Sequence, residues 1–171
     1  KASAASLWVS EFFKKSKYKK NNIVYGHTKS KDYLSKNYKN INLKNLKSKL
    51  KSTTYEYAEK LIKEINNNFD IVEIHNRPLL LFKLISKVKS KFIFYFHNDP
   101  LSMKGSKSVK ERLKILENVE KIIFVSEWVR GRFFLNIDKK LQTKTEVVFP
   151  SVNKQKKIKK EKNIIFVGRL N

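Results

Sequence analysis

The sequence contains no cysteine, which excludes a disulfide framework, a thiolate metal site and cysteine catalysis. It has no run of 18 apolar residues, the length that a membrane-spanning helix requires. Glycine and proline are scarce, at four and three residues. The patterns G-x-G-x-x-G, Walker A and G-x-S-x-G are all absent. These absences argue against an ordinary dinucleotide enzyme, a P-loop ATPase and a serine hydrolase.

Acidic residues are also few, since 15 of them face 39 basic residues and leave a formal net charge of +24. Only five of the basic residues are arginine, and the lysines are dispersed along the chain. Specific nucleic-acid readers rely on arginine for bidentate contacts and gather their charge on one face. The composition therefore favours weak attraction to an anionic membrane surface over a specific nucleic-acid role.

With 171 residues, 40% of them hydrophobic, the chain is long enough for one folded domain, or for one domain and the beginning of another. It opens Lys1-Ala2-Ser3 without methionine, and we interpret it as a trimmed or partial product. We expect a cytoplasmic protein.

Short apolar runs recur along the chain and predict strands near residues 23–25, 71–74, 92–96, 122–125, 147–149 and 164–167. Helical signals lie between them: an amphipathic segment from Leu7 to Phe13, capping boxes of Thr53 with Glu56 and of Ser108 with Glu111, and a cap at Ser126. This alternation predicts an α/β fold with a doubly wound, mainly parallel, Rossmann-like sheet.

Three parts of the chain are distinguished by their composition. Residues 1–153 carry the alternating pattern, with a polar connection at 29–51 that includes a short strand near Ile41. Residues 154–162 are a lysine-rich linker. Residues 163–171 hold one strand, which we expect to begin a second domain.

All three histidines follow predicted strands, where open parallel sheets bind their ligands. Histidine donates and accepts hydrogen bonds, pairs with anions and accepts protons near neutral pH. A zinc site of His27, His75 and His97 is the alternative, but the sequence has no closely spaced ligand pair. We therefore expect no metal.

Two strand-end loops have the same form, His75-Asn76-Arg77-Pro78 and His97-Asn98-Asp99-Pro100. Each places donors and acceptors before a proline that restricts the turn, an arrangement suited to hydroxyl-rich ligands. At Ser126, backbone N–H groups at the start of a helix could bind an anion. The alternative is that Ser126 only caps the helix.

The ordered set of these segments, ending in Pro150-Ser-Val-Asn153 and Val167-Gly168-Arg169-Leu170, resembles the retaining glycosyltransferases of family four, which have the GT-B fold. The resemblance runs from about the first predicted helix to the end of the chain. It implies that this chain is the acceptor-side domain together with the first strand of the donor-binding domain. The family's first strand and glycine-rich loop are missing ahead of that helix, and its donor-site lysine and glutamates would lie beyond Asn171. The chain thus corresponds to a fragment that would be inactive alone.

The resemblance also implies roles for individual residues. His97 would act at the transferred sugar, His75 would bind the acceptor, and Gly168 and Arg169 would contact the donor diphosphate. From the loop composition we add Asn76, Arg77, Asn98 and Asp99 to the acceptor site, and from the helix start we add Ser126 to the donor site. The complete enzyme would transfer a sugar from a nucleotide-diphosphate donor to a glycan or lipid-linked acceptor with retention, in envelope polysaccharide or glycolipid synthesis. No cofactor or obligatory metal is implied. Peripheral contact with the inner face of the membrane would suit the basic surface.

Two other functions remain open from the sequence. One is a non-catalytic module that binds polyanions, which salt-sensitive binding to unrelated nucleic acids would reveal. The other is a related two-domain isomerase that epimerises nucleotide sugars without an acceptor.

Overall fold

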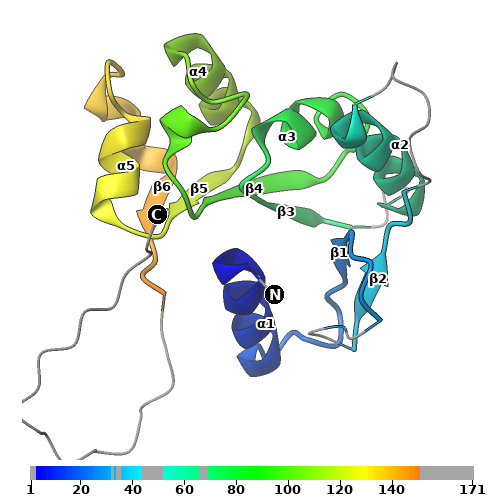
Figure 1. Cartoon of the computed structure of the whole chain (residues 1–171). Helices are drawn as coiled ribbons and strands as arrows, with labels where there is room; N and C mark the ends of the chain where they lie inside the picture. The colour runs from blue at the N-terminus through cyan, green and yellow to red at the C-terminus, as the bar shows by residue number, and fades with distance from the viewer. Residues whose placement is uncertain (1–2, 32, 34–35, 44–51, 66–68, 151–171) are drawn as a thin grey trace, which may run out of the picture.

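The computed structural model describes residues 3–31, 33, 36–43, 52–65 and 69–150. Five helices, six strands and two short 3-10 helices occur within these ranges (Figure 1). In chain order they are α1 (Ala4–Lys15), β1 (Val24–Gly26), β2 (Tyr38–Asn40), α2 (Thr53–Ile65), β3 (Ile71–His75), α3 (Pro78–Leu84), β4 (Lys91–Phe96), η1 (Pro100–Ser102), α4 (Val109–Asn118), β5 (Lys121–Phe124), α5 (Glu127–Phe133), η2 (Lys139–Lys144) and β6 (Thr145–Val147).

The strands of the described residues form two parallel sheets. The larger sheet has the order β3-β4-β5-β6, and the smaller one pairs β1 with β2. Helices α3 and α4 lie over one face of the larger sheet, and α1 lies on the opposite side (Figure 1). The predicted α/β, Rossmann-like architecture with parallel strands is confirmed. The predicted linker at 154–162 and the strand at 163–171 lie outside the described residues.

The core lies on the face of the larger sheet that α3 and α4 cover. Side chains alternate along a strand, so Phe92, Phe94 and Phe96 of β4 share one face, and each is at most 5% exposed. They belong to a hydrophobic cluster with Leu81 and Leu84 of α3 and with residues of α2, α4 and α5. Burial of this apolar surface supplies the main favourable free energy of folding.

The other face carries the alternate residues of the same strands. On β4 these are Ile93 and Tyr95, with His97 directly after the strand, and on β3 they include Glu73 and His75. Trp8 of α1 packs against this face, with its ring centroid 5.4 Å from that of Tyr95. One sheet face therefore builds the core, and the other presents polar and aromatic side chains beneath α1.

Two of the three predicted helix caps are confirmed. Ser108 and Glu111 form the complete capping box of α4, and Ser126 Oγ accepts the Val129 N–H of α5. The predicted capping box at Thr53 is wrong, because Thr53 is already the first residue of α2. Ser52 takes the cap position instead, and its Oγ accepts the Tyr55 N–H at 3.3 Å. Glu56 pairs with Lys60 at 2.8 Å.

Helix α3 was not predicted from the sequence. It starts at Pro78, whose fixed φ suits the first helical position and whose missing N–H would be unpaired there anyway. The helix has only seven residues, too few for a clear periodic pattern. Within the described ranges, no helix is long and apolar enough to cross a membrane.

A buried arginine joins the loop before α4 to the end of α5. Arg112 is 2% exposed, and its guanidinium donates to the carbonyl oxygens of Ser106, Lys107 and Leu135 at 3.2, 2.6 and 2.7 Å. Burial lowers the pKa of this group. These contacts add hydrogen bonds between two segments that also meet through the hydrophobic core.

Candidate functional site

The two histidines at the carboxyl ends of β3 and β4 contact each other directly. His75 Nδ1 lies 2.9 Å from His97 Nε2, and the ring centroids are 5.2 Å apart with nearly parallel planes. Neighbouring parallel strands end at the same edge of the sheet, which brings the last residue of β3 beside the residue that follows β4. One ring nitrogen must donate and the other accept, so the contact requires at least one neutral imidazole.

Aromatic side chains enclose this histidine pair. Tyr95 stacks on His75 with centroids 4.4 Å apart, and the Trp8 ring lies 5.9 Å from His75 and 5.3 Å from His97. Burial, together with the neighbouring His97, lowers the pKa of His75 to about 3, and burial also lowers the pKa of His97. Both imidazoles are therefore neutral at pH 7 and act through hydrogen bonds, which disfavours the anion-pairing role that the sequence left open for them.

Glu73 extends the row of polar groups on the same face. Its carboxylate accepts the Tyr95 hydroxyl at 3.3 Å and lies 3.9 Å from His75 Nε2. Burial raises the pKa of Glu73, and burial with this neighbour raises the pKa of Tyr95. The nearby carboxylate favours the tautomer of His75 that carries its proton on Nε2. His75 Nδ1 then accepts a hydrogen bond from His97 Nε2. The ring nitrogen that can still accept a hydrogen bond is Nδ1 of His97.

Asn76 fixes the loop beside His97. It has a left-handed φ of 54°, and its backbone N–H donates to the Tyr95 carbonyl at 2.9 Å. Its side-chain oxygen accepts the His97 N–H at 2.8 Å. The asparagine amide therefore continues the β3–β4 pairing by one step, and the position of the His97 backbone depends on it. Its predicted contact with an acceptor stays a prediction.

The other predicted acceptor residues lie around this edge with contacts of their own. Asp99 binds Arg132 of α5 through two hydrogen bonds of 3.2 and 3.0 Å, which lower the pKa of its carboxyl group, and it also accepts the Leu101 N–H. The guanidinium of Arg77 lies 5.3 Å from the centre of the Tyr57 ring. Asn98 is exposed in the loop after β4.

Of the predicted donor residues, the structure describes Ser126. Ser126 is a helix cap, as the alternative interpretation of its sequence pattern expected, and α5 has only seven residues. Gly168 and Arg169 lie outside the described residues. His27 is bonded through Nδ1 to the Ile41 carbonyl, away from the histidine pair. No group of three metal-ligating side chains occurs within the described ranges, which gives the zinc alternative no support there.

Trp8, Glu73 and Tyr95 were missed as members of the site. Two of them could have been found from the sequence, because Glu73 and Tyr95 stand two residues before His75 and His97 and so share their sheet face. Trp8 gives no comparable signal, since its place depends on the packing of α1. No protein-family model matches this chain, and no curated protein or solved structure matches it either.

Proposed function

We propose that this chain is the acceptor-side domain of a retaining glycosyltransferase that uses a nucleotide-diphosphate sugar. The observation that carries the proposal is the neutral, hydrogen-bonded pair of His75 and His97 at the carboxyl edge of a Rossmann-like sheet. Ligands of such sheets bind at this edge. A neutral imidazole pair is suited to binding hydroxyl groups, which are the reacting groups of a sugar acceptor.

The row of Glu73, His75 and His97 suggests how an acceptor hydroxyl would be oriented. With the proton of His75 on Nε2 and that of His97 on Nε2, the His97 Nδ1 lone pair accepts a hydrogen bond from the hydroxyl. The hydroxyl oxygen then forms the new bond to the anomeric carbon as the bond to the diphosphate breaks. As the new bond forms, the acceptor proton shifts from its hydrogen bond with His97 Nδ1 to an oxygen of the leaving diphosphate, and His97 stays neutral. His97 thus positions the nucleophile, and Glu73 acts through His75.

The donor contacts and the cellular place of the enzyme are further parts of the proposal. Arg169, Gly168 and Ser126 would stabilise the negative charge that develops on the leaving diphosphate. The acceptor would be a glycan or lipid-linked sugar of the cell envelope, handled at the cytoplasmic face of the membrane. The excess of lysine favours such contact, because each lysine near an anionic surface contributes about 1 kcal/mol.

Acceptor binding can be tested on this chain through Trp8, which lies 5.3 Å from the His97 ring. The other tryptophan, Trp128, is removed as Trp128→Phe so that the fluorescence reports on Trp8 alone. Titration with glycans and with water-soluble glycolipid analogues should give saturable changes that His97→Ala weakens by about tenfold or more. Lys140→Ala, an exposed change distant in sequence, is the matched control. Equal responses in the two variants would contradict a binding role for His97.

Catalysis is tested in the complete gene product, with the release of nucleoside diphosphate measured with and without acceptor. We expect His97→Ala to lower acceptor-dependent turnover at least about tenfold with little change in melting temperature, since a positioned hydrogen bond to the reacting group contributes roughly 2–4 kcal/mol. Turnover without any acceptor would favour an epimerase. Binding to unrelated nucleic acids that falls steeply with salt and ignores His97→Ala would favour a polyanion-binding module.

A further inference from the structure

An exposed tryptophan lies at the carboxyl edge of the larger sheet, the edge that carries the histidine pair. Trp128 is 61% exposed and belongs to the first turn of α5, the helix that begins soon after β5. The Val125 N–H donates to the Phe96 carbonyl at 3.2 Å, so the segment that leads to Trp128 starts beside His97. Chain lengths then place the Cα atoms of Trp128 and His97 no more than about 18 Å apart.

Buried and paired side chains hold this tryptophan in place. Val129 and Phe133 anchor α5 in the hydrophobic core. The Arg132 guanidinium lies 5.7 Å from the centre of the Trp128 ring and binds Asp99 through two hydrogen bonds of 3.2 and 3.0 Å. Because Asp99 belongs to the loop after β4, these contacts tie the ring to the edge of the sheet. The ring is therefore a preorganised surface that a ligand need not order on binding.

The charges of α5 cancel, although the whole chain carries a net charge of +24. All three charged side chains of the helix form ion pairs, Arg132 with Asp99 and Arg130 with Glu127. They add no net charge beside the ring, which favours a neutral ligand there over a polyanion. Arg132 uses Nε and Nη2 for Asp99, and its Nη1 has no hydrogen-bond partner within the described ranges. Nη1 is therefore available to donate to a hydroxyl group.

Gly131 leaves space open next to the ring. Positions 131 and 132 follow Trp128 by three and four residues, so side chains there lie on its side of the helix and lean towards it. Apart from its chain neighbours, a Cβ added at Gly131 would meet no described residue within 4 Å, and its φ lies outside the left-handed region. Glycine is less favourable than alanine inside a helix. Neither backbone conformation nor packing requires this glycine, whereas a ligand lying over Trp128 would.

We propose that Trp128, Arg132 and the space over Gly131 bind one sugar unit of a neutral glycan. The C–H groups on one face of a sugar ring pack on an aromatic face, whose π electrons attract their slightly positive hydrogens, and a hydroxyl oxygen accepts from Arg132 Nη1. This proposal rests on the proposed function, because it gives the acceptor that reacts at His97 a second contact. A glycan of a few sugar units spans the distance, so the acceptor is an oligosaccharide or a glycolipid with several sugars.

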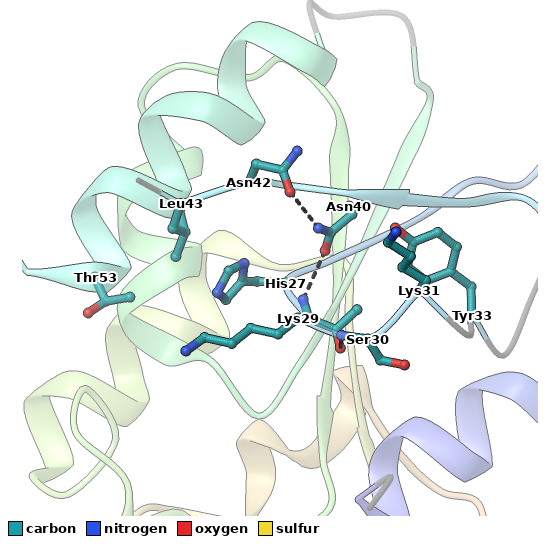
Figure 2. Close-up of a pocket in the computed structure, with 10 residues that line it drawn as sticks. His27, Lys29, Ser30, Lys31, Tyr33, Asn40, Asn42, Leu43 and Thr53 are labelled. Carbon is teal, nitrogen blue, oxygen red and sulfur yellow. Dashed lines mark hydrogen bonds between the residues drawn. The ribbon is translucent and has the colours of Figure 1, made fainter. Parts of the chain in front are cut away.

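A cavity at the carboxyl ends of β1 and β2 is another hollow with hydroxyl and amide groups, and its volume is about 560 Å³ (Figure 2). Figure 2 shows Lys29 and Lys31 at opposite ends of it, so the cavity does not concentrate charge at one point. Its aromatic residue, Tyr33, already stacks on Tyr38 with ring centroids 4.7 Å apart. The experiment therefore includes a variant of this cavity as a control.

The probes are the methyl glycosides and the linear tetrasaccharides of glucose, mannose and N-acetylglucosamine, and calorimetry measures their binding. We expect at least one tetrasaccharide to bind saturably, and Trp128→Ala to weaken it at least about tenfold while methyl glycoside binding changes less than about twofold. Trp128→Phe keeps a flat ring and should lose much less. Tyr18→Ala, which removes a ring that is 62% exposed, and Lys29→Gln in the cavity are the matched controls and should change binding less than about twofold.

Gly131→Leu tests the ligand space without removing a contact. Leucine should fill the space and weaken tetrasaccharide binding at least about tenfold, whereas Gly131→Ala should retain most of it. Both variants replace a helical glycine, so neither should lower the melting temperature, and a loss of binding is then not a loss of folding.

The outcomes separate this proposal from the proposed function. Binding that His97→Ala weakens and Trp128→Ala does not would overturn the sugar site at Trp128 and leave the proposed function in place. The reverse result would support the sugar site and contradict the role of His97. Equal losses in Trp128→Ala and Tyr18→Ala, a loss only in Lys29→Gln, or no saturable binding of any tetrasaccharide would also overturn the proposal.

Discussion

His75 should make the folded protein less stable as the pH falls below neutrality. Burial lowers the pKa of His75 from 6.5 to about 3 in the folded state, whereas an unfolded chain leaves it near 6.5. Between these values the unfolded state binds the proton and the folded state does not. The free energy of unfolding therefore rises with pH across this window, and its fall on acidification begins near pH 6.5 and continues towards pH 3.

The size of the effect follows from this shift. Each pH unit within the window changes the free energy of unfolding by about 1.4 kcal/mol for one proton. At pH 4.5, two units below the pKa of His75 in the unfolded chain, His75 alone should lower the free energy of unfolding by about 2–3 kcal/mol. This is a large fraction of the roughly 5–15 kcal/mol that holds a domain folded.

Glu73 acts with the opposite sign and must be separated from His75. Burial raises its pKa, so the folded state takes up a proton at a higher pH than the unfolded chain does. Its contribution therefore becomes more favourable as the pH falls. The comparison of wild type with His75→Asn cancels this effect, because Glu73 is present in both, and the asparagine amide takes the place of Nδ1 without ionising.

The assay is urea unfolding followed by tryptophan fluorescence at several pH values from 7.5 to 4.5. As the pH decreases, the free energy of unfolding of the wild type should fall more steeply than that of His75→Asn, by about 1.4 kcal/mol per pH unit. Nitrogen chemical shifts of the imidazoles provide a second measurement and should show His75 still neutral at pH 5. A His75 that protonates near pH 6.5 in the folded protein, or equal slopes in the two proteins, would refute the reasoning.

Three substitutions test other parts of the fold by urea unfolding. Arg112→Met keeps the aliphatic stem but leaves three backbone carbonyls without their donor, and it should cost about 3 kcal/mol; an unchanged midpoint would mean that these carbonyls find other partners. Ser108→Ala removes the cap of α4 and should lower the free energy of unfolding by about 1 kcal/mol. No loss of stability would mean that this end of the helix is frayed in the wild type. Gly105→Ala should cost about 1–3 kcal/mol, because Gly105 has a φ of 91° and an added Cβ would lie 3.2 Å from the Leu79 backbone nitrogen; a neutral result would contradict that backbone conformation.

The larger sheet could be predicted because its strands carry strong local signals. Phe92 to Phe96 is apolar on both faces, which indicates a strand in the middle of a covered sheet, and β4 indeed lies between β3 and β5. Helix α3 gave no such signal, since seven residues make only two turns. At α2, Ser52 and Thr53 are equally good caps, and only the tertiary structure decides which of them starts the helix.

The sequence predicts which strand ends meet at one edge of the sheet, but it does not predict the contacts between their side chains. Parallel strands end at one edge, so His75 and His97 were expected on the same side of the molecule. Their hydrogen bond depends on the register that pairs His75 with Tyr95, which a sequence does not reveal. The place of Trp8 depends in turn on how α1 packs, more than 60 residues before the histidines it covers. Such long-range packing has no local pattern.

Side chains alternate between the two faces of the sheet along β4, so residues that stabilise the core and residues of the candidate site occur in the same strand. Phe92, Phe94 and Phe96 face the core, so their loss would unfold the sheet, whereas Tyr95 and the adjoining His97 face α1. The lowered pKa values of the histidines arise from burial, and the Trp8 ring of α1 lies 5.9 Å from the His75 ring and 5.3 Å from the His97 ring. If α1 moved away, water would reach both imidazoles and their pKa values would return towards 6.5. The contact with Trp8 therefore helps to keep both imidazoles uncharged as the pH falls below 6.5.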